Sequence, residues 1–163
     1  PLEPALIFVN RTLISFNLRE KVRIIASGKV LTSLDILRAV AMGADMCNNA
    51  RGFMFALGCI QAMQCHKNTC PTGITTHNTK LQKGLDPTDK AERVAAYQRN
   101  LSKSVAMIAH SCGLAEPRQL KIHHLHIINS NGFSVPWDSV NPQPLIFTAT
   151  ENRTSSGEAS AKN

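Results

Sequence analysis

The sequence predicts an α/β fold that forms only part of a larger parallel sheet. Two short apolar runs, residues 21–27 and 44–49, have the length and composition of strands. A helix of about ten residues separates them, and strands connected in this way form a right-handed unit with parallel strands. Parallel sheets are several strands wide and covered on both faces, so two strands are not enough. We therefore expect further strands from outside this chain.

The helices around these strands carry clear sequence signals. Apolar residues recur at helical spacing from Leu6 to Phe16, which predicts a helix over Glu3–Asn17. The helix between the strands begins at Thr32, a residue type that caps helix N-termini, and is closed by Gly43.

Helices also dominate the second half of the chain. Residues 50–63 are apolar on nearly all sides and predict a helix that is buried on most of its surface. We expect a short helix near Glu116–Leu125, and an irregular, disordered tail over residues 129–163, which are rich in Asn, Pro, Ser and Thr. A long helix over residues 86–113 is predicted by a stripe of Ala91, Val94, Ala95, Leu101, Val105, Ile108, Ala109 and Cys112.

Composition excludes several classes of protein. The net charge is +7, but the basic residues are scattered and aromatic residues make up only 5%, so a nucleic-acid partner is not expected. No apolar run reaches about 18 residues, so no membrane span is expected. The first residues lack a secretory leader, and five cysteines is an odd number. We therefore expect reduced cysteines and a cytoplasmic location.

Phosphate-binding features follow both predicted strands. Gly28 and Lys29 end the first strand, and Arg51 and Gly52 lie between the second strand and the next helix. Backbone N–H groups at such positions bind phosphate, and in (β/α)8 barrels this site commonly follows strands seven and eight. A glycine at a strand end is also a common turn residue, so this signal is weak by itself.

Three of the five cysteines lie within twelve residues. Cys59, Cys65 and Cys70 have the spacing C-x5-C-x4-C, and a proline follows the third. The odd cysteine count and the expected compartment argue against disulfides. A zinc site normally has four protein ligands, and His66 directly follows Cys65, so the two cannot easily reach one ion.

Two readings of the cysteines remain open. Unrelated core cysteines are plausible for Cys47 and Cys112, but not for Cys65 and Cys70, which lie in a polar loop. Soft thiolates on a loop suit an iron–sulfur cluster. Three ligands fit a 3Fe–4S cluster, or a 4Fe–4S cluster with an open corner.

Residues 56–73, ALGCIQAMQCHKNTCPTG, resemble the iron–sulfur loop of the glutamate synthase large subunit. Residues 25–61 are most similar to the stand-alone FMN-binding relatives within that family. The first half alone is also similar to other flavin- and nucleotide-binding barrels, including IMP dehydrogenase, but those do not account for the cysteines. Lys29, Asn48 and Ala50 replace glycines of the classical enzymes, which points to the related branch of the family.

The resemblance implies a specific fold and cofactor set. Residues 1–128 would be the C-terminal part of an FMN-binding (β/α)8 TIM barrel, about its last two βα units, with additional helices and an iron–sulfur loop over 59–76. Cys59, Cys65 and Cys70 would bind a 3Fe–4S cluster. The residues implied at the FMN phosphate are Ser27, Gly28 and Lys29 after the first strand, and Asn49, Ala50, Arg51 and Gly52 after the second.

The implied activity is that of an oxidoreductase that reduces 2-iminoglutarate, formed from 2-oxoglutarate and ammonia, to glutamate. The electron donor would be an NAD(P)H-linked subunit or ferredoxin. A complete barrel needs about 250 residues, so the 163-residue chain is expected to be inactive without its missing N-terminal barrel portion or a partner subunit. The alternative is a non-enzymatic iron–sulfur electron-transfer or assembly module. No catalytic residue is assigned.

Overall fold

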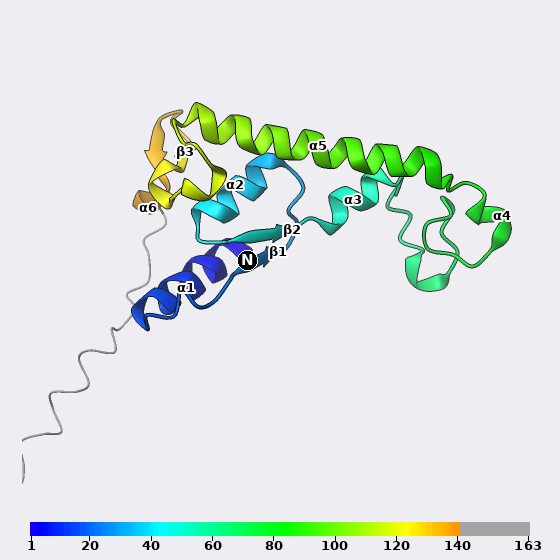
Figure 1. Ribbon diagram of the computed structural model, residues 1–163, viewed down its shortest axis with the longest axis horizontal. Helices are drawn as coiled ribbons and strands as arrows, with labels where there is room; N and C mark the ends of the chain where they lie inside the picture. Colours follow the sequence, from blue (N-terminus) through cyan, green and yellow to red (C-terminus); the bar gives the residue numbers. More distant parts are fainter. Residues whose placement is uncertain (141–163) are drawn as a thin grey trace, which may run out of the picture.

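The computed structural model describes residues 1–140 and is built around one long helix, α5 (Figure 1). Helices α2 and α3 both pack against α5. The cysteine-containing loop lies near the start of α5, and the last described elements lie near its end (Figure 1). The elements are α1 (Leu2–Ser15), β1 (Ile25–Ser27), α2 (Ser33–Ala41), β2 (Met46–Asn48), α3 (Ala50–Ala56), η1 (Cys65–Lys67), α4 (Thr79–Gln82), α5 (Pro87–Ser111), η2 (Pro117–Gln119), η3 (Ile122–His124), β3 (His126–Ile128), β4 (Ser134–Pro136) and α6 (Trp137–Val140).

The predicted parallel pair is confirmed. Strands β1 and β2 are parallel, and Ile25 lies opposite Met46. Helix α2 connects them, as expected for a βαβ unit. Only Ala26 is buried in these strands, whereas Ile25 is 53% exposed and Met46 is 46% exposed. Apolar strand residues in a parallel sheet are normally covered, so this pair presents apolar surface that further elements would cover.

Strand β1 is shorter than the predicted run over residues 21–27. The amide of Ile24 donates to the Oδ2 atom of Asp45 at 2.7 Å, so it is bonded to a side chain. The carboxylate of Asp45 also pairs with Arg19 at 2.9 Å, and this anchors the loop that precedes β1. Because of these polar contacts, the strand begins at Ile25 and not at residue 21.

The predicted N-cap of α2 is confirmed. The Thr32 hydroxyl accepts a hydrogen bond from the Asp35 amide at 3.2 Å, and the Asp35 carboxylate accepts one from the Thr32 amide at 2.9 Å. This reciprocal pair is a capping box. Burial raises the pKa of Asp35, but hydrogen bonds from Thr32 and Leu31 outweigh it, and the pKa lies below its ordinary value.

The buried core lies on both sides of α2. On one side, Leu6 and Ile7 of α1 pack with residues of α2 and with Ala26 of β1. On the other side, Leu37 and Ala41 pack against Ala109 of α5. Helix α2 is therefore the middle layer. It is covered on one side by α1 and the strand pair, and on the other side by α5. The predicted stripe of α1 is only partly buried, because Val9 and Phe16 are exposed.

The prediction that residues 50–63 form one helix buried on most sides is wrong. Helix α3 ends at Ala56, and Gly52 is its only buried residue. Gly58 has a φ of +100°, a conformation that glycine adopts readily and that ends helices. The amide of Cys59 donates to the carbonyl of Met54 at 3.0 Å and closes this end. Cys59 therefore lies in the loop after the helix.

Three other expectations differ from the structure. The single helix expected near 116–125 is two separate 3-10 turns, η2 and η3, which are separated by Leu120 and by Lys121, the latter in an extended conformation. The tail expected to be irregular from residue 129 contains regular structure up to Val140, namely strand β4, which pairs antiparallel with β3, and helix α6. The turn between β3 and β4 is held by Asn129, whose Oδ1 atom accepts from the amide of Phe133 at 2.9 Å. Cys112, expected in the core, is exposed.

The rest of the predicted tail, residues 141–163, lies outside the described residues. Of the helices within residues 1–140, none is both long enough and apolar enough to cross a membrane.

The Asp45→Asn variant is expected to be destabilised at pH 7 by about 1–2 kcal/mol. Burial raises the pKa of Asp45, but the Ile24 amide, Arg19 and Arg23 outweigh it and hold the pKa below its ordinary value. A lowered folded-state pKa stabilises the fold above the unfolded pKa, and this stabilisation is lost as the pH falls through the folded value. Urea unfolding should therefore show a difference in the free energy of unfolding between wild type and variant, and this difference should become smaller below about pH 4.

The matched control for Asp45 is Glu92→Gln. Glu92 forms an ion pair with Arg99 on the solvent side of α5, and both side chains are exposed. Exposed pairs contribute about 0–1 kcal/mol, so this variant should unfold nearly as wild type does. A gap for Asp45→Asn that is the same at pH 7 and pH 3 would contradict the assigned role of its charge.

Candidate functional site

The two segments predicted to bind phosphate are neighbours in the structure. Ser27 lies opposite Asn48, so both strands of the parallel pair end at the same edge. Gly28 and Lys29 follow β1 at this edge and are exposed. Lys29 has a φ of +55°, which is the left-handed conformation that glycine adopts at no steric cost. The loop thus keeps a glycine-like backbone while presenting a lysine side chain.

The second segment is held from inside the fold by Asn49 and Tyr97. The Asn49 side-chain amide donates to the Tyr97 hydroxyl at 2.5 Å, and that hydroxyl donates to the carbonyl of Leu31 at 2.8 Å. Asn49 is buried and also caps α3. Tyr97 lies on α5, so one side chain of the long helix connects the loop after β1 with the loop after β2.

Gly52 has a packing role at this junction. Its amide donates to the Oδ1 atom of Asn49 at 2.9 Å, and a Cβ atom at Gly52 would overlap the Tyr97 hydroxyl. The ring of Tyr97 also contacts Phe53 edge-to-face, with centroids 5.2 Å apart. The structure therefore turns Asn49 and Gly52 inward and leaves Ala50 and Arg51 exposed.

All three predicted cysteine ligands line one cavity of about 520 Å³, and Ala50 and Arg51 line it as well. This cavity joins the start of α3 to the loop that carries the cysteines. Its remaining walls are mostly apolar and include Met54, Phe55, Ile60 and Met63. The second segment predicted to bind phosphate and the cysteine-containing loop therefore line the same cavity.

The three cysteines differ in environment. Cys70 is buried, and its sulfur lies 3.2 Å from the Thr72 hydroxyl. Hydrogen bonds from Thr72, and then from the backbone of Thr75, lower the pKa of Cys70 to about 6, so its thiolate predominates at neutral pH. Cys59 is half-buried and Cys65 is exposed on η1, and all three are free thiols.

The three thiols are chemically suited to a metal cluster that takes soft ligands. The loop that carries them is, however, more open than a closed metal site. Thiolates are the ligands that iron–sulfur clusters require. Within residues 1–140, however, no three Cys, His, Asp or Glu side chains converge closely enough to hold a metal ion. Binding would therefore be coupled to closure of the loop around Cys65, as is common where metal sites form together with local folding.

The loop after the cysteines is well anchored. The Asn68 carbonyl accepts from the Thr76 hydroxyl at 2.7 Å, and the Asn68 side chain accepts from the His77 amide at 2.6 Å. Gly73 has a φ of +80° and packs against the backbone of Leu81, the next turn of chain. These contacts hold Cys70 in place.

Sequence reasoning missed Tyr97. It is the only tyrosine in the chain, and on α5 it lies three residues after Val94 and four before Leu101, on the same face as the apolar stripe. A lone tyrosine within an apolar stripe is a signal, since a buried hydroxyl normally finds a hydrogen-bond partner. Its partners, however, depend on tertiary structure.

Comparison with known proteins places the chain in a family. Residues 1–115 match the conserved region in glutamate synthase. The chain is 39% identical over 140 residues to the glutamate synthase large subunit-like protein YerD of Bacillus subtilis, covering 86% of this chain and 27% of that protein. It is 33% identical over 121 residues to an archaeal glutamate synthase (NADPH) of Methanocaldococcus jannaschii, covering 74% of this chain and 24% of that protein.

A further relative is an archaeal-type glutamate synthase (NADPH) of Dehalococcoides mccartyi, which is 31% identical over 127 residues, covering 78% of this chain and 25% of that protein. The chain therefore spans about a quarter of the length of these relatives. The match to residues 1–115 includes both strand ends and all three clustered cysteines. The chain belongs to the glutamate synthase family.

Proposed function

We propose that this chain is the C-terminal part of an FMN- and iron–sulfur-dependent oxidoreductase of the glutamate synthase type. The reaction would be the reductive formation of glutamate from 2-oxoglutarate and ammonia through 2-iminoglutarate. The observation that carries the proposal is the cavity shared by Ala50, Arg51 and the three cysteines. It would place a flavin phosphate segment and a cluster loop side by side.

The cofactors divide between two sets of residues. Ser27, Gly28 and Lys29 after β1, together with Ala50 and Arg51 at the start of α3, would surround the FMN phosphate. Lys29 and Arg51 would supply positive charge from neighbouring strand ends, and Asn49 and Gly52 would fix the backbone between them. When bound, the flavin and the cluster would supply hydride and single-electron transfer.

Cys59, Cys65 and Cys70 would hold a 3Fe–4S cluster. The lowered pKa of Cys70 favours the thiolate that a metal requires. Cys65 is the most exposed of the three and lies on a short 3-10 turn. It would therefore be the last of the three ligands to bind, and its binding would close the site.

We also propose that the chain completes a (β/α)8 barrel whose other strands lie outside it. The parallel pair leaves Ile25 and Met46 about half exposed. The missing strands of the barrel would cover these two side chains. The chain covers about a quarter of its relatives. The isolated 163 residues are accordingly expected to show no glutamate synthesis, and turnover by them would contradict this part of the proposal.

Cys65→Ser is expected to abolish cluster assembly, because two remaining thiolates cannot replace the third ligand. The chain would be reconstituted anaerobically with iron and sulfide, and bound iron and sulfide measured. The matched control is Cys112→Ser, since Cys112 is an exposed cysteine outside the loop. Wild type and Cys112→Ser should retain equal iron.

Equal iron in Cys65→Ser and wild type would overturn the ligand assignment. If wild type retains no iron, the same reconstitution on a chain extended upstream decides the matter. Assembly there would show that the loop needs the rest of the barrel, and failure there would contradict cluster binding.

A further inference from the structure

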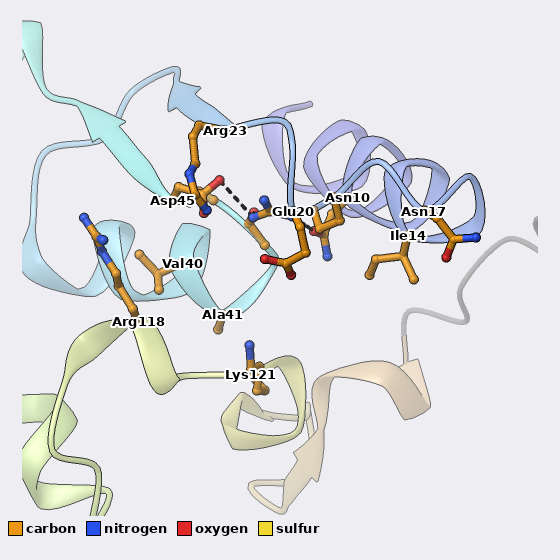
Figure 2. Close-up of a pocket in the computed structure, with 13 residues that line it drawn as sticks. Asn10, Ile14, Asn17, Glu20, Arg23, Val40, Ala41, Asp45, Arg118 and Lys121 are labelled. Atoms are coloured by element: carbon orange, nitrogen blue, oxygen red, sulfur yellow. Dashed lines mark hydrogen bonds and ion pairs between the residues drawn. The ribbon is translucent and has the colours of Figure 1, made fainter.

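A second cavity, of about 680 Å³, lies at the opposite end of the strand pair from the proposed cofactor site. It is lined by the loop that precedes β1 and by Asp45, which precedes β2. The segment around η2 and η3 forms the other wall and contributes Arg118 and Lys121 (Figure 2). Its volume is within the range of small-molecule sites, about 300–1,000 Å³.

One wall of this cavity is a fixed ionic structure. Arg19 donates to the Asn10 side chain at 2.7 Å, to the Val22 carbonyl at 2.9 Å and to the Gly43 carbonyl at 2.9 Å. It also pairs with Asp45 at 2.9 Å. Arg19 therefore neutralises Asp45, and its hydrogen-bonding capacity is used within the wall.

The remaining charges in the cavity are mostly positive. Arg23 lies 3.6 Å from Asp45, with a side chain that is 65% exposed. Within residues 1–140, neither Arg118 nor Lys121 forms an ion pair. In Figure 2, Arg118 and Lys121 come from the segment below the cavity and Arg23 comes from the loop above it, and Glu20 lies between Arg23 and Lys121. Three cations against one carboxylate leave the cavity positively charged.

We propose that this cavity binds a small anion with at least two negative charges, carried by phosphate or carboxylate groups. Arg23 would contact it from one wall, and Arg118 and Lys121 from the other. Arginine suits such ligands because its planar guanidinium pairs with carboxylate or phosphate through two hydrogen bonds. Glu20 would accept a hydrogen bond from a hydroxyl or ammonium group of the ligand. This site is separate from the proposed cofactor site and does not depend on it.

Calorimetric titration of the 163-residue chain with pyrophosphate and, separately, with citrate would test the proposal. At a constant ionic strength of about 0.15 M, where exposed charges are screened beyond roughly 8 Å, we expect saturable one-to-one binding. The Arg118→Gln/Lys121→Gln variant should bind about tenfold more weakly, as expected for two exposed charge pairs. Tighter binding of pyrophosphate would indicate a phosphate ligand, and tighter binding of citrate a polycarboxylate.

The control variant Lys83→Gln/Lys103→Gln also removes two positive charges, at exposed positions that do not line the cavity. It should bind as wild type does. Equal weakening in both double variants, or no saturable binding of either probe, would overturn the proposal. If the Arg118→Gln/Lys121→Gln variant does not fold, Arg23→Gln decides, because it removes a cation from the other wall and should weaken binding about threefold.

Discussion

The Gly73→Ala variant is expected to lose about 3 kcal/mol of unfolding free energy. Gly73 has a φ of +80°, and a Cβ atom there would overlap the carbonyl oxygen of Leu81 and lie 3.1 Å from the Cα atom of Gln82. Both neighbours are backbone atoms of the α4 segment, so no side-chain rotation relieves the overlap. The loop that positions Cys70 would have to shift, and iron retention should fall with stability.

The Gly132→Ala variant separates backbone strain from steric overlap. Gly132 has a φ of +82°, and a Cβ atom there would meet no atom within 4 Å. This variant should lose only the cost of the left-handed conformation, about 1 kcal/mol. Equal losses for Gly73→Ala and Gly132→Ala in denaturant unfolding would show that the contact with α4 does not hold the loop.

The Gly52→Ala variant is also expected to lose about 3 kcal/mol, because it overpacks a buried junction and disturbs its hydrogen bonds. The added methyl group would overlap the Tyr97 hydroxyl and the Oδ1 atom of Asn49. Separation of α3 from α5 would break the link between the two strand-end loops. If FMN binds there, its affinity should fall together with stability.

A double-mutant cycle with Tyr97→Phe tests this mechanism. Removing the hydroxyl relieves part of the overlap at Gly52, so Gly52→Ala should cost less in the Tyr97→Phe background than in wild type. Tyr97→Phe alone should cost about 1–2 kcal/mol, because it leaves the buried Asn49 amide with one fewer partner. Additive effects would contradict direct contact between the two positions.

Much of the fold was predictable because it depends on local signals. The cap residue Thr32 predicted α2 and the apolar stripe predicted α5, and both helices are confirmed. The parallel βαβ unit followed from the length of the connecting helix, and it is confirmed by the pairing of Ile25 with Met46. Family membership followed from the cysteine spacing and its flanking residues, and is confirmed by the match over residues 1–115.

What the sequence did not predict depends on contacts between distant residues. The end of α3 is set by the backbone of Gly58, while the apolar composition beyond it continues to favour helix. The Tyr97 hydroxyl reaches Leu31 across 66 positions of the chain, which no spacing rule anticipates. The positively charged cavity brings together Arg23 and Lys121, whose charges appear scattered in the sequence. The cluster and FMN assignments stay predictions.

Electron paramagnetic resonance of the anaerobically reconstituted chain, extended upstream to include the remaining barrel, tests the central claim most directly. The account predicts the signal of an oxidised 3Fe–4S cluster in wild type and in Cys112→Ser, and its loss in Cys59→Ser, Cys65→Ser and Cys70→Ser. A signal that survives all three loop substitutions, or that is absent from the extended wild-type protein, would contradict it.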